Sequence, residues 1–185
     1  MNKRTIHLYF RTNDLETMVS FLREYEGIVV SEVLERRITL VDAGKYDQVD
    51  VNHLRELTLV EFYQDFTAFI EPYSPNFDAL PIVEILPKIN PGVYTIASII
   101  PQIVLFNLHE ARIALRNYYY NLIGTETIQT VIGFIEADLN ASKASKSLFM
   151  HRNTLNYRLD HFVFTTGIDI RTFMGAYSFY LLYRA

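Results

Sequence analysis

Residues 138–167 read DLNASKASKSLFMHRNTLNYRLDHFVFTTG, and this stretch decides the fold of the C-terminal half of the chain. Asn140 is a typical capping residue, because its side chain can accept hydrogen bonds from the first free backbone N–H groups of a helix. In residues 141–148, small side chains alternate with Lys143 and Lys146. This pattern predicts a short helix that packs closely against its neighbours.

A second helix is predicted to follow after a tight joint. The joint holds Phe149 and Met150, which we expect to be buried because both are apolar. The helix is predicted to begin near His151 or Arg152 and to end at Gly167, since glycine is common just after a helix C-terminus. Two short helices joined in this way form a helix–turn–helix, which in DNA-binding proteins presents its second helix to the major groove. The predicted core face of the second helix repeats at helical spacing and comprises Leu155, Leu159 and Phe162.

The segment SLFMHRNTLNYRLDHFVFTTGIDI, residues 147–170, resembles the C-terminal helix–turn–helix of the PucR/CdaR family of bacterial transcriptional regulators. The family pattern runs from an apolar residue, Phe and an aliphatic residue into His-Arg-Asn-Thr-Leu-x-Tyr-Arg-Leu, which here is residues 148–159. The resemblance covers about residues 115–184, and it includes the preceding segment GTETIQTVIGFIEADLN. It implies a transcriptional regulator with double-stranded DNA as its partner.

The resemblance and the helix positions together give each polar side chain an expected role. We expect the first helix to hold backbone phosphates through Ser142, Lys143 and Lys146. We expect the second helix to meet base edges and nearby phosphates, since asparagine suits adenine and arginine suits guanine. The residues for this second role are Arg152, Asn153, Thr154, Asn156 and Tyr157.

Two further residues of the second helix have two expected roles each. His151 is expected either to contact a phosphate in a pH-sensitive way or to cap the helix. Arg158 lies beside the core face, and we expect it either to touch DNA or to brace the fold through a carboxylate. Both remain in the set of candidate DNA-binding residues.

Three positions depart from the family pattern: Ser145 stands where the family usually has Ala, and the other two support an alternative. Asn156 and Asp160 stand where the family usually has a basic residue, and Asp160 is predicted to lie on the exposed face. A carboxylate there would be repelled by phosphates, and each lost phosphate contact weakens affinity. Residues 140–161 carry a net charge of only +3. The alternative is a diverged helix–turn–helix protein that no longer binds DNA and acts through protein–protein interaction.

The hydrophobic pattern of the N-terminal half is typical of a small β-α-β-β domain. The predicted elements are a strand at 5–10, a capped helix at 13–25, strands at 28–34 and 37–41, and a turn at 42–45. Residues 51–70 fit either a helix or a helix followed by a strand. The proline-rich residues 71–92 predict loop and short extended pieces, and helices are predicted at 96–120 and 125–138.

These elements predict an α+β fold with two domains. Residues 1–92 are expected to form a small α+β regulatory or dimerisation domain. Residues 93–185 are expected to form a mostly helical domain, whose helix–turn–helix covers about 140–167. The charge divides in the same way, with a net −7 over residues 1–137 and a net +3 over residues 138–185. An acidic body with a basic end fits a regulatory domain joined to a nucleic-acid reader.

Several function classes lose support from the composition. The chain has no cysteine, so it has no disulfide framework or thiolate metal site, and it fits a reducing cytoplasm. No apolar run approaches the roughly 18 residues that a membrane span needs. No phosphate-binding glycine loop, GxSxG elbow or HExxH motif is present, and the five histidines are scattered. We therefore expect a cytoplasmic protein that is not an enzyme and has neither cofactor nor metal site.

The expected partners follow from the predicted DNA-binding helix–turn–helix. One helix–turn–helix domain covers only a short stretch of DNA, and two-fold symmetry matches palindromic operators, so we expect a homodimer. The apolar segments 99–108 and 177–183 could supply its surface, although core packing explains them equally well. The N-terminal domain leaves room for a small-molecule effector of unknown identity. Of the three consecutive tyrosines 118–120, we expect Tyr119 and its neighbours to face the core or a partner subunit rather than a ligand.

Overall fold

The computed structural model describes residues 4–44, 48–72 and 77–184. Contacts between Cα atoms divide the chain into two compact units, residues 1–96 and 97–185. The sequence placed the boundary between residues 92 and 93. Each unit has its own buried apolar residues.

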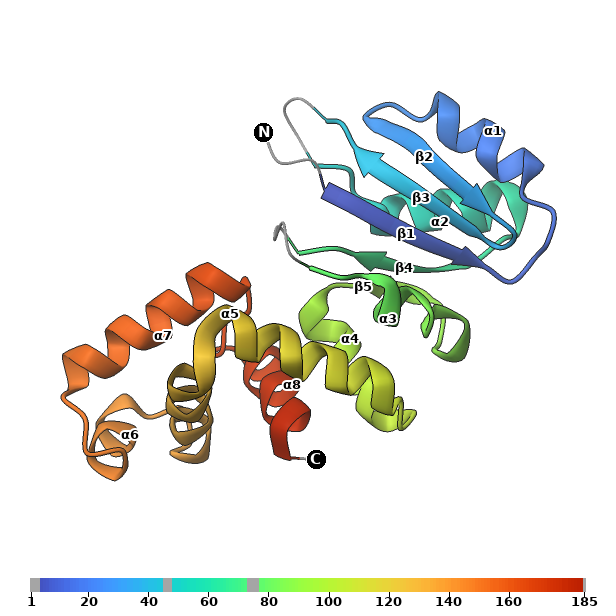
Figure 1. Ribbon diagram of the computed structural model, residues 1–185. Helices are drawn as coiled ribbons and strands as arrows, with labels where there is room; N and C mark the ends of the chain where they lie inside the picture. Colours follow the sequence, from blue (N-terminus) through green and yellow to red (C-terminus); the bar gives the residue numbers. More distant parts are fainter. Residues whose placement is uncertain (1–3, 45–47, 73–76, 185) are drawn as a thin grey trace. The chain divides into compact units, whose positions relative to one another are not determined.

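The N-terminal unit is built around a five-stranded sheet with the strand order β2-β3-β1-β4-β5. β1 pairs antiparallel with β3 and with β4, β2 pairs antiparallel with β3, and β5 is parallel to β4 (Figure 1). Its elements are β1 (Arg4–Phe10), α1 (Glu16–Glu24), β2 (Ile28–Leu34), β3 (Arg37–Asp42), α2 (Val51–Phe62), β4 (Phe66–Ile70), α3 (Leu80–Val83), the 3₁₀ turn η1 (Leu86–Lys88) and β5 (Gly92–Tyr94).

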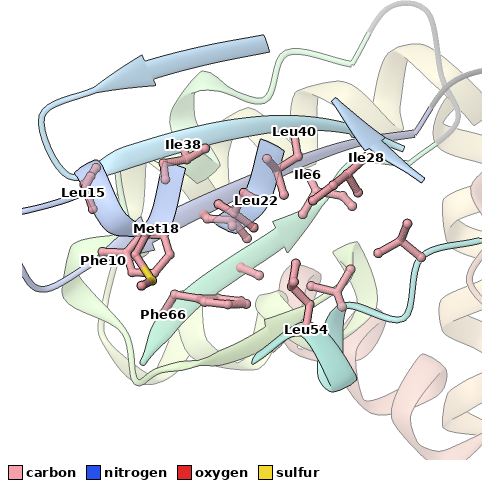
Figure 2. Close-up of a cluster of buried hydrophobic side chains, with 14 residues drawn as sticks. Ile6, Phe10, Leu15, Met18, Leu22, Ile28, Ile38, Leu40, Leu54 and Phe66 are labelled. Atoms are coloured by element: carbon pink, nitrogen blue, oxygen red, sulfur yellow. The ribbon is translucent and has the colours of Figure 1, made fainter. Parts of the chain in front are cut away.

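One face of this sheet carries the core, because apolar residues alternate along its central strands. In β1 the buried positions are Ile6, Leu8 and Phe10, and β3 places Leu40 and Ile38 opposite the first two. Helices α1 and α2 cover this face. Figure 2 shows their side chains meeting those of the strands, and the contributing helical residues are Met18, Leu22 and Leu54.

The predicted β-α-β-β opening is confirmed, except for the start of its helix. Asn13 does not cap α1, which begins three residues later at Glu16; its side-chain oxygen instead accepts a hydrogen bond from Arg36. Residues 51–70 form the second of the two expected alternatives, helix α2 followed by strand β4. The expectation of loop and short extended pieces at residues 71–92 is wrong for α3 and η1, which are helical, whereas β5 is a short extended piece. Lys45 of the predicted turn lies outside the described residues.

The C-terminal unit is helical. Its elements are α4 (Ile96–Leu105), α5 (His109–Glu136), α6 (Ala141–Ser147), α7 (Arg152–Thr166) and α8 (Phe173–Arg184). The predicted helix at 96–120 is divided in two, because Asn107 adopts a left-handed backbone with φ of 55°. α5 bends at Gly124, whose φ of 73° and ψ of 163° favour glycine, and Figure 1 shows this bend. The α+β class is confirmed, since a sheet unit precedes a helical one.

α5 supports the rest of the C-terminal unit, and it contacts α6, α7 and α8. Tyr119 of α5 is fully buried and packs edge-on against Phe179 of α8, with ring centroids 5.7 Å apart. This placement confirms the expectation that Tyr119 faces the core. Arg116 of α5 donates to the backbone oxygen of Leu182 at 2.7 Å and so satisfies a free carbonyl at the end of α8.

No helix within the described ranges is both long and apolar enough to cross a bilayer.

Candidate nucleic-acid interface

Helix α6 begins where the sequence predicts. The side chain of Asn140 accepts hydrogen bonds from the backbone N–H groups of Ser142 and Lys143 at 3.0 and 3.1 Å. These bonds satisfy two of the N–H groups that a helix start leaves without a partner. Ala144 is fully buried, which lets this short helix approach α5 and α7 closely. The predicted cap at Asn140 is therefore confirmed.

The turn between α6 and α7 has a left-handed residue at its centre. Phe149 has φ of 50°, and its N–H donates to the backbone oxygen of Lys146 at 3.3 Å. The next N–H, of Met150, donates to the oxygen of Ser145 at 2.9 Å. These two bonds form a Schellman motif, which ends a helix and usually has glycine at the left-handed position.

The expectation that Phe149 is buried is wrong, since its side chain is 97% exposed. The left-handed backbone turns this side chain away from the helices, and Leu148 makes the internal contact instead. Leu148 lies so close to α5 that a Cβ on Gly133 would come within 2.6 Å of its side chain. Met150 is only half-buried.

Helix α7 also has the predicted ends and core face. Leu155, Leu159 and Phe162 are at most 1% exposed. Gly167 ends the helix with φ of 70° and donates its N–H to the oxygen of Val163. At the other end His151 is the cap, because its Nδ1 accepts from the N–H of Asn153 at 3.2 Å.

The expected base-reading side chains lie in the first two turns of α7. Arg152, Asn153, Thr154 and Tyr157 are exposed, whereas Asn156 is half-buried. The Tyr157 ring stacks on His161 one turn further along, with centroids 6.4 Å apart and planes 6° from parallel. In α6, the expected phosphate-contacting residues are also exposed: Ser142, Lys143 and Lys146.

The four cations that the sequence assigns to the interface are not equally available. Arg158 donates to Oε1 of Glu126 at 2.6 Å and to Oγ1 of Thr130 at 3.3 Å, so it braces α7 against α5. Lys143 forms an exposed ion pair with Asp138. Lys146 and Arg152 are exposed, and neither has an ion pair in the part of the chain that the structure describes.

Asp160 is exposed, as expected, but its charge is compensated. Its Oδ1 accepts a hydrogen bond from Arg171, in the loop between α7 and α8, at 2.7 Å. Arg171 could not be predicted as the partner of Asp160, because the loop after Gly167 must fold back along α7 before the two residues meet. An internal partner for Asp160 weakens the argument that its carboxylate repels phosphates.

No cluster of His, Cys, Asp or Glu suited to a metal ion occurs among residues 4–44, 48–72 and 77–184. What α6 and α7 offer is therefore a set of hydrogen-bond donors, two unpaired cations and a helix N-terminus, all of which favour contact with an anionic, hydrogen-bonding surface.

A short helix, a tight turn and a second helix with a polar exposed start define this part of the chain as a helix–turn–helix domain. Residues 127–185 match the family model described as the PucR C-terminal helix-turn-helix domain. The resemblance seen in the sequence is therefore confirmed over these residues. The match begins at residue 127, later than the expected start near residue 115.

Two proteins of Bacillus subtilis (strain 168) are each similar to part of this chain. One is the uncharacterized protein YxkF, 40% identical over 58 residues, which are 31% of this chain and 20% of that protein. The other is the DNA-binding transcriptional activator AdeR, 36% identical over 83 residues, which are 40% of this chain and 20% of that protein. The similar part thus spans about a fifth of the length of these two relatives.

Among solved structures, a regulator of polyketide synthase expression from Bifidobacterium adolescentis is similar with a TM-score of 0.48 and 16% identity. That likeness covers 97% of this chain and 78% of the other.

Proposed function

We propose that this protein is a DNA-binding transcriptional regulator, not an enzyme, and that α7 is the helix that reads DNA. The observation that carries the proposal is the exposed start of α7 in a PucR-type helix–turn–helix. There Arg152, Asn153 and Thr154 are all exposed next to the free N–H groups of the helix N-terminus. In helix–turn–helix proteins, this end of the second helix contacts base edges.

The proposed contacts divide into base reading and phosphate binding. Asn153 and Arg152 have the hydrogen-bonding groups that suit adenine and guanine in the major groove. Thr154, Asn156 and Tyr157 flank them and are proposed to meet nearby bases or phosphates. Phosphate contacts are proposed for the exposed face of α6, which carries Ser142, Lys143 and Lys146.

His151 and Arg158 have supporting roles in this proposal. An accepting Nδ1 on His151 carries no hydrogen, so the neutral ring has its N–H at Nε2 and can donate to a phosphate while it caps α7. Arg158 is held by Glu126 and Thr130, and we propose that it positions α7 rather than binds DNA.

A homodimer in the cytoplasm is part of the same proposal, with the N-terminal unit as the regulatory or dimerisation part. Two copies related by a two-fold axis would place two α7 helices on one palindromic site. Light scattering coupled to size exclusion is the direct measurement, and a mass of twice 21.6 kDa is the expected result.

The experiment that tests DNA binding uses fluorescence anisotropy with a labelled duplex from the region upstream of the protein's own gene. Wild type and Arg152→Ala are titrated at about 50 and 200 mM salt. Wild type is expected to bind more weakly at high salt, and Arg152→Ala to lose roughly 1–3 kcal/mol of affinity. Arg184→Ala is a matched control, because Arg184 pairs with Glu136 in the same domain but outside α6 and α7.

A second candidate function is protein–protein interaction by a helix–turn–helix that no longer binds DNA. It is favoured by the ion pairs of Lys143 and Arg158, which leave few free cations on the surface of α6 and α7. Folded protein that fails to bind the duplex, and also mixed-sequence DNA, at 50 mM salt would support this second function.

A further inference from the structure

Phe149 lies in the turn of the helix–turn–helix, three residues before Arg152. Its backbone has φ of 50° and its side chain is 97% exposed. The left-handed position of a Schellman motif is usually occupied by glycine, because a side chain there crowds the backbone. A bulky aromatic residue at this position is therefore unfavourable for the fold.

The exposed ring does not recover this cost within the chain. A side chain that is 97% exposed buries almost no apolar surface, whereas the internal contact of the turn is made by Leu148 against Gly133. The ring is exposed in the unfolded chain as well, so its exposure adds nothing to the stability of the fold. The left-handed backbone disfavours Phe149 in the isolated domain and no burial offsets that cost, so a benefit outside the domain is the consistent explanation.

The surroundings of Phe149 indicate where that benefit arises. Its chain neighbours on the side of α7 are half-buried Met150 and exposed His151, and the exposed Arg152 and Asn153 follow. Donors and cations in this group suit phosphates and base edges, and none of them supplies an apolar contact. The apolar groups that a DNA duplex offers beside a base edge are the C5-methyl of thymine and the faces of deoxyribose.

We propose that Phe149 is an apolar DNA-contact residue, which packs against a thymine methyl or a deoxyribose at the edge of the groove that α7 enters. This inference rests on the proposed DNA binding. Its consequence is that the same side chain destabilises the free domain and stabilises the complex, so one substitution should change folding and binding in opposite directions.

The test compares wild type with Phe149→Gly in the full chain. Thermal unfolding is expected to show a Tm higher by roughly 2–4 °C for the variant, because glycine accepts the left-handed backbone without crowding. Affinity for a duplex that wild type selects from a random-sequence library is expected to fall about tenfold, through loss of apolar burial. The dependence of affinity on salt should not change, because no charge is removed.

Tyr63→Gly is the matched control. Tyr63 has φ of 55° directly after α2 and is 89% exposed, but it lies in the N-terminal unit, outside the residues that match the family. This substitution should also raise the Tm and should leave DNA affinity unchanged. Arg152→Ala is the opposite control, since it should reduce both the affinity and its salt dependence.

A duplex synthesised with deoxyuridine in place of every thymidine separates the two apolar partners. If the partner is a thymine methyl, wild type loses affinity for this duplex and Phe149→Gly does not. If the partner is deoxyribose, both proteins bind the two duplexes with the same ratio of affinities. Either result supports the proposal, provided that Phe149→Gly binds the thymidine duplex more weakly than wild type.

Equal affinity of wild type and Phe149→Gly for the selected duplex would overturn the role of Phe149 and leave the proposed DNA binding intact. A lower Tm for Phe149→Gly would overturn the argument from the backbone. Failure of wild type to bind or select any DNA is a different result, which removes the proposed function itself.

Discussion

Each of the two units of the chain contains an ion pair of similar length, but the two pairs differ in how far they are buried. In the N-terminal unit, Arg4 and Asp42 are 2.8 Å apart, and their side chains are only 11% and 5% exposed. In the helix–turn–helix, Arg171 and Asp160 are 2.7 Å apart, but their side chains are 42% and 68% exposed. Removing one partner of a buried pair leaves a charge without solvent, whereas an exposed pair contributes little to stability. The distance alone therefore does not tell which pair maintains the fold.

The largest expected effect is on the buried pair. Asp42 also accepts from the backbone N–H of Val49 at 3.0 Å, so Asp42→Ala would leave this N–H without its partner. It would also leave the charge of Arg4 without a carboxylate, although Arg4 keeps its hydrogen bonds to the Val49 oxygen and to Gln48. We expect a loss of about 3 kcal/mol in the free energy of unfolding. Urea unfolding followed by circular dichroism measures it. Asp160→Ala is the matched control, with an expected change below about 0.5 kcal/mol, and equal losses in the two variants would contradict the comparison.

Helix caps should show the two units behaving alike. Asp50 caps α2 by accepting from the N–H groups of Asn52 and His53, as Asn140 caps α6. Asp50→Ala and Asn140→Ala are each expected to lower the free energy of unfolding by about 1 kcal/mol. The same urea titration measures both, and Asn140→Asp, which keeps an accepting oxygen, should retain most of the stability. Only Asn140→Ala should also weaken DNA binding, and an equal loss of affinity with Asp50→Ala would argue against α6 as part of the interface.

A smaller effect is expected from the exposed pair, and it concerns binding rather than folding. Arg171→Ala leaves the charge of Asp160 uncompensated on the face of α7. DNA affinity at low salt should fall about three- to tenfold, while the free energy of unfolding changes by less than about 0.5 kcal/mol. The double variant Arg171→Ala/Asp160→Asn should bind more tightly than Arg171→Ala alone. Equal affinities of the single and double variants would show that Asp160 does not oppose DNA binding.

The smallest effect at neutral pH is expected at Tyr119. Its buried hydroxyl has no hydrogen-bond partner among the described residues, so Tyr119→Phe should change the free energy of unfolding by less than about 0.5 kcal/mol at pH 7. Burial raises the pKa of Tyr119 well above its ordinary value of 10.0. A raised pKa means that the neutral form is favoured by folding, so its contribution is complete below about pH 10 and is lost as the pH rises further.

Urea unfolding at pH 7 and near pH 11 tests both expectations for Tyr119, the small effect at neutral pH and the loss of stability at high pH. Wild type should lose more stability between the two pH values than Tyr119→Phe does. The same loss in both proteins would mean that the buried hydroxyl of Tyr119 does not control stability at high pH.

Patterns that depend on neighbouring residues could be predicted from the sequence. The alternation in β1, the core face of α7 and the cap at Asn140 all follow from spacing within a few residues. The α+β class followed from these local patterns. The family motif at residues 148–159 then connected α6 and α7 to DNA, which charge and spacing alone did not do.

Two kinds of feature could not be predicted: those that depend on the sign of a backbone φ angle, and those that depend on contacts between residues far apart in the sequence. The amino-acid sequence around Phe149 does not indicate that its φ is positive, and an apolar residue in the turn between two helices is more often buried. The end of α4 was missed for the same reason at Asn107. The Asp160–Arg171 pair depends on the path of the loop after Gly167, and the Arg36–Asn13 contact depends on the register of β2 and β3.

The most direct test of the account is a comparison of the DNA sequences selected by wild type and by Asn153→Ala from a random library. If α7 reads base edges, wild type yields a defined site, and Asn153→Ala yields the same site with the preference lost at one position, expected to be an adenine. Binding by the variant at about 1–3 kcal/mol weaker affinity should accompany this change. An unchanged site in the variant would contradict the assignment of α7 as the reading helix, and no defined site for wild type would contradict sequence-specific DNA binding.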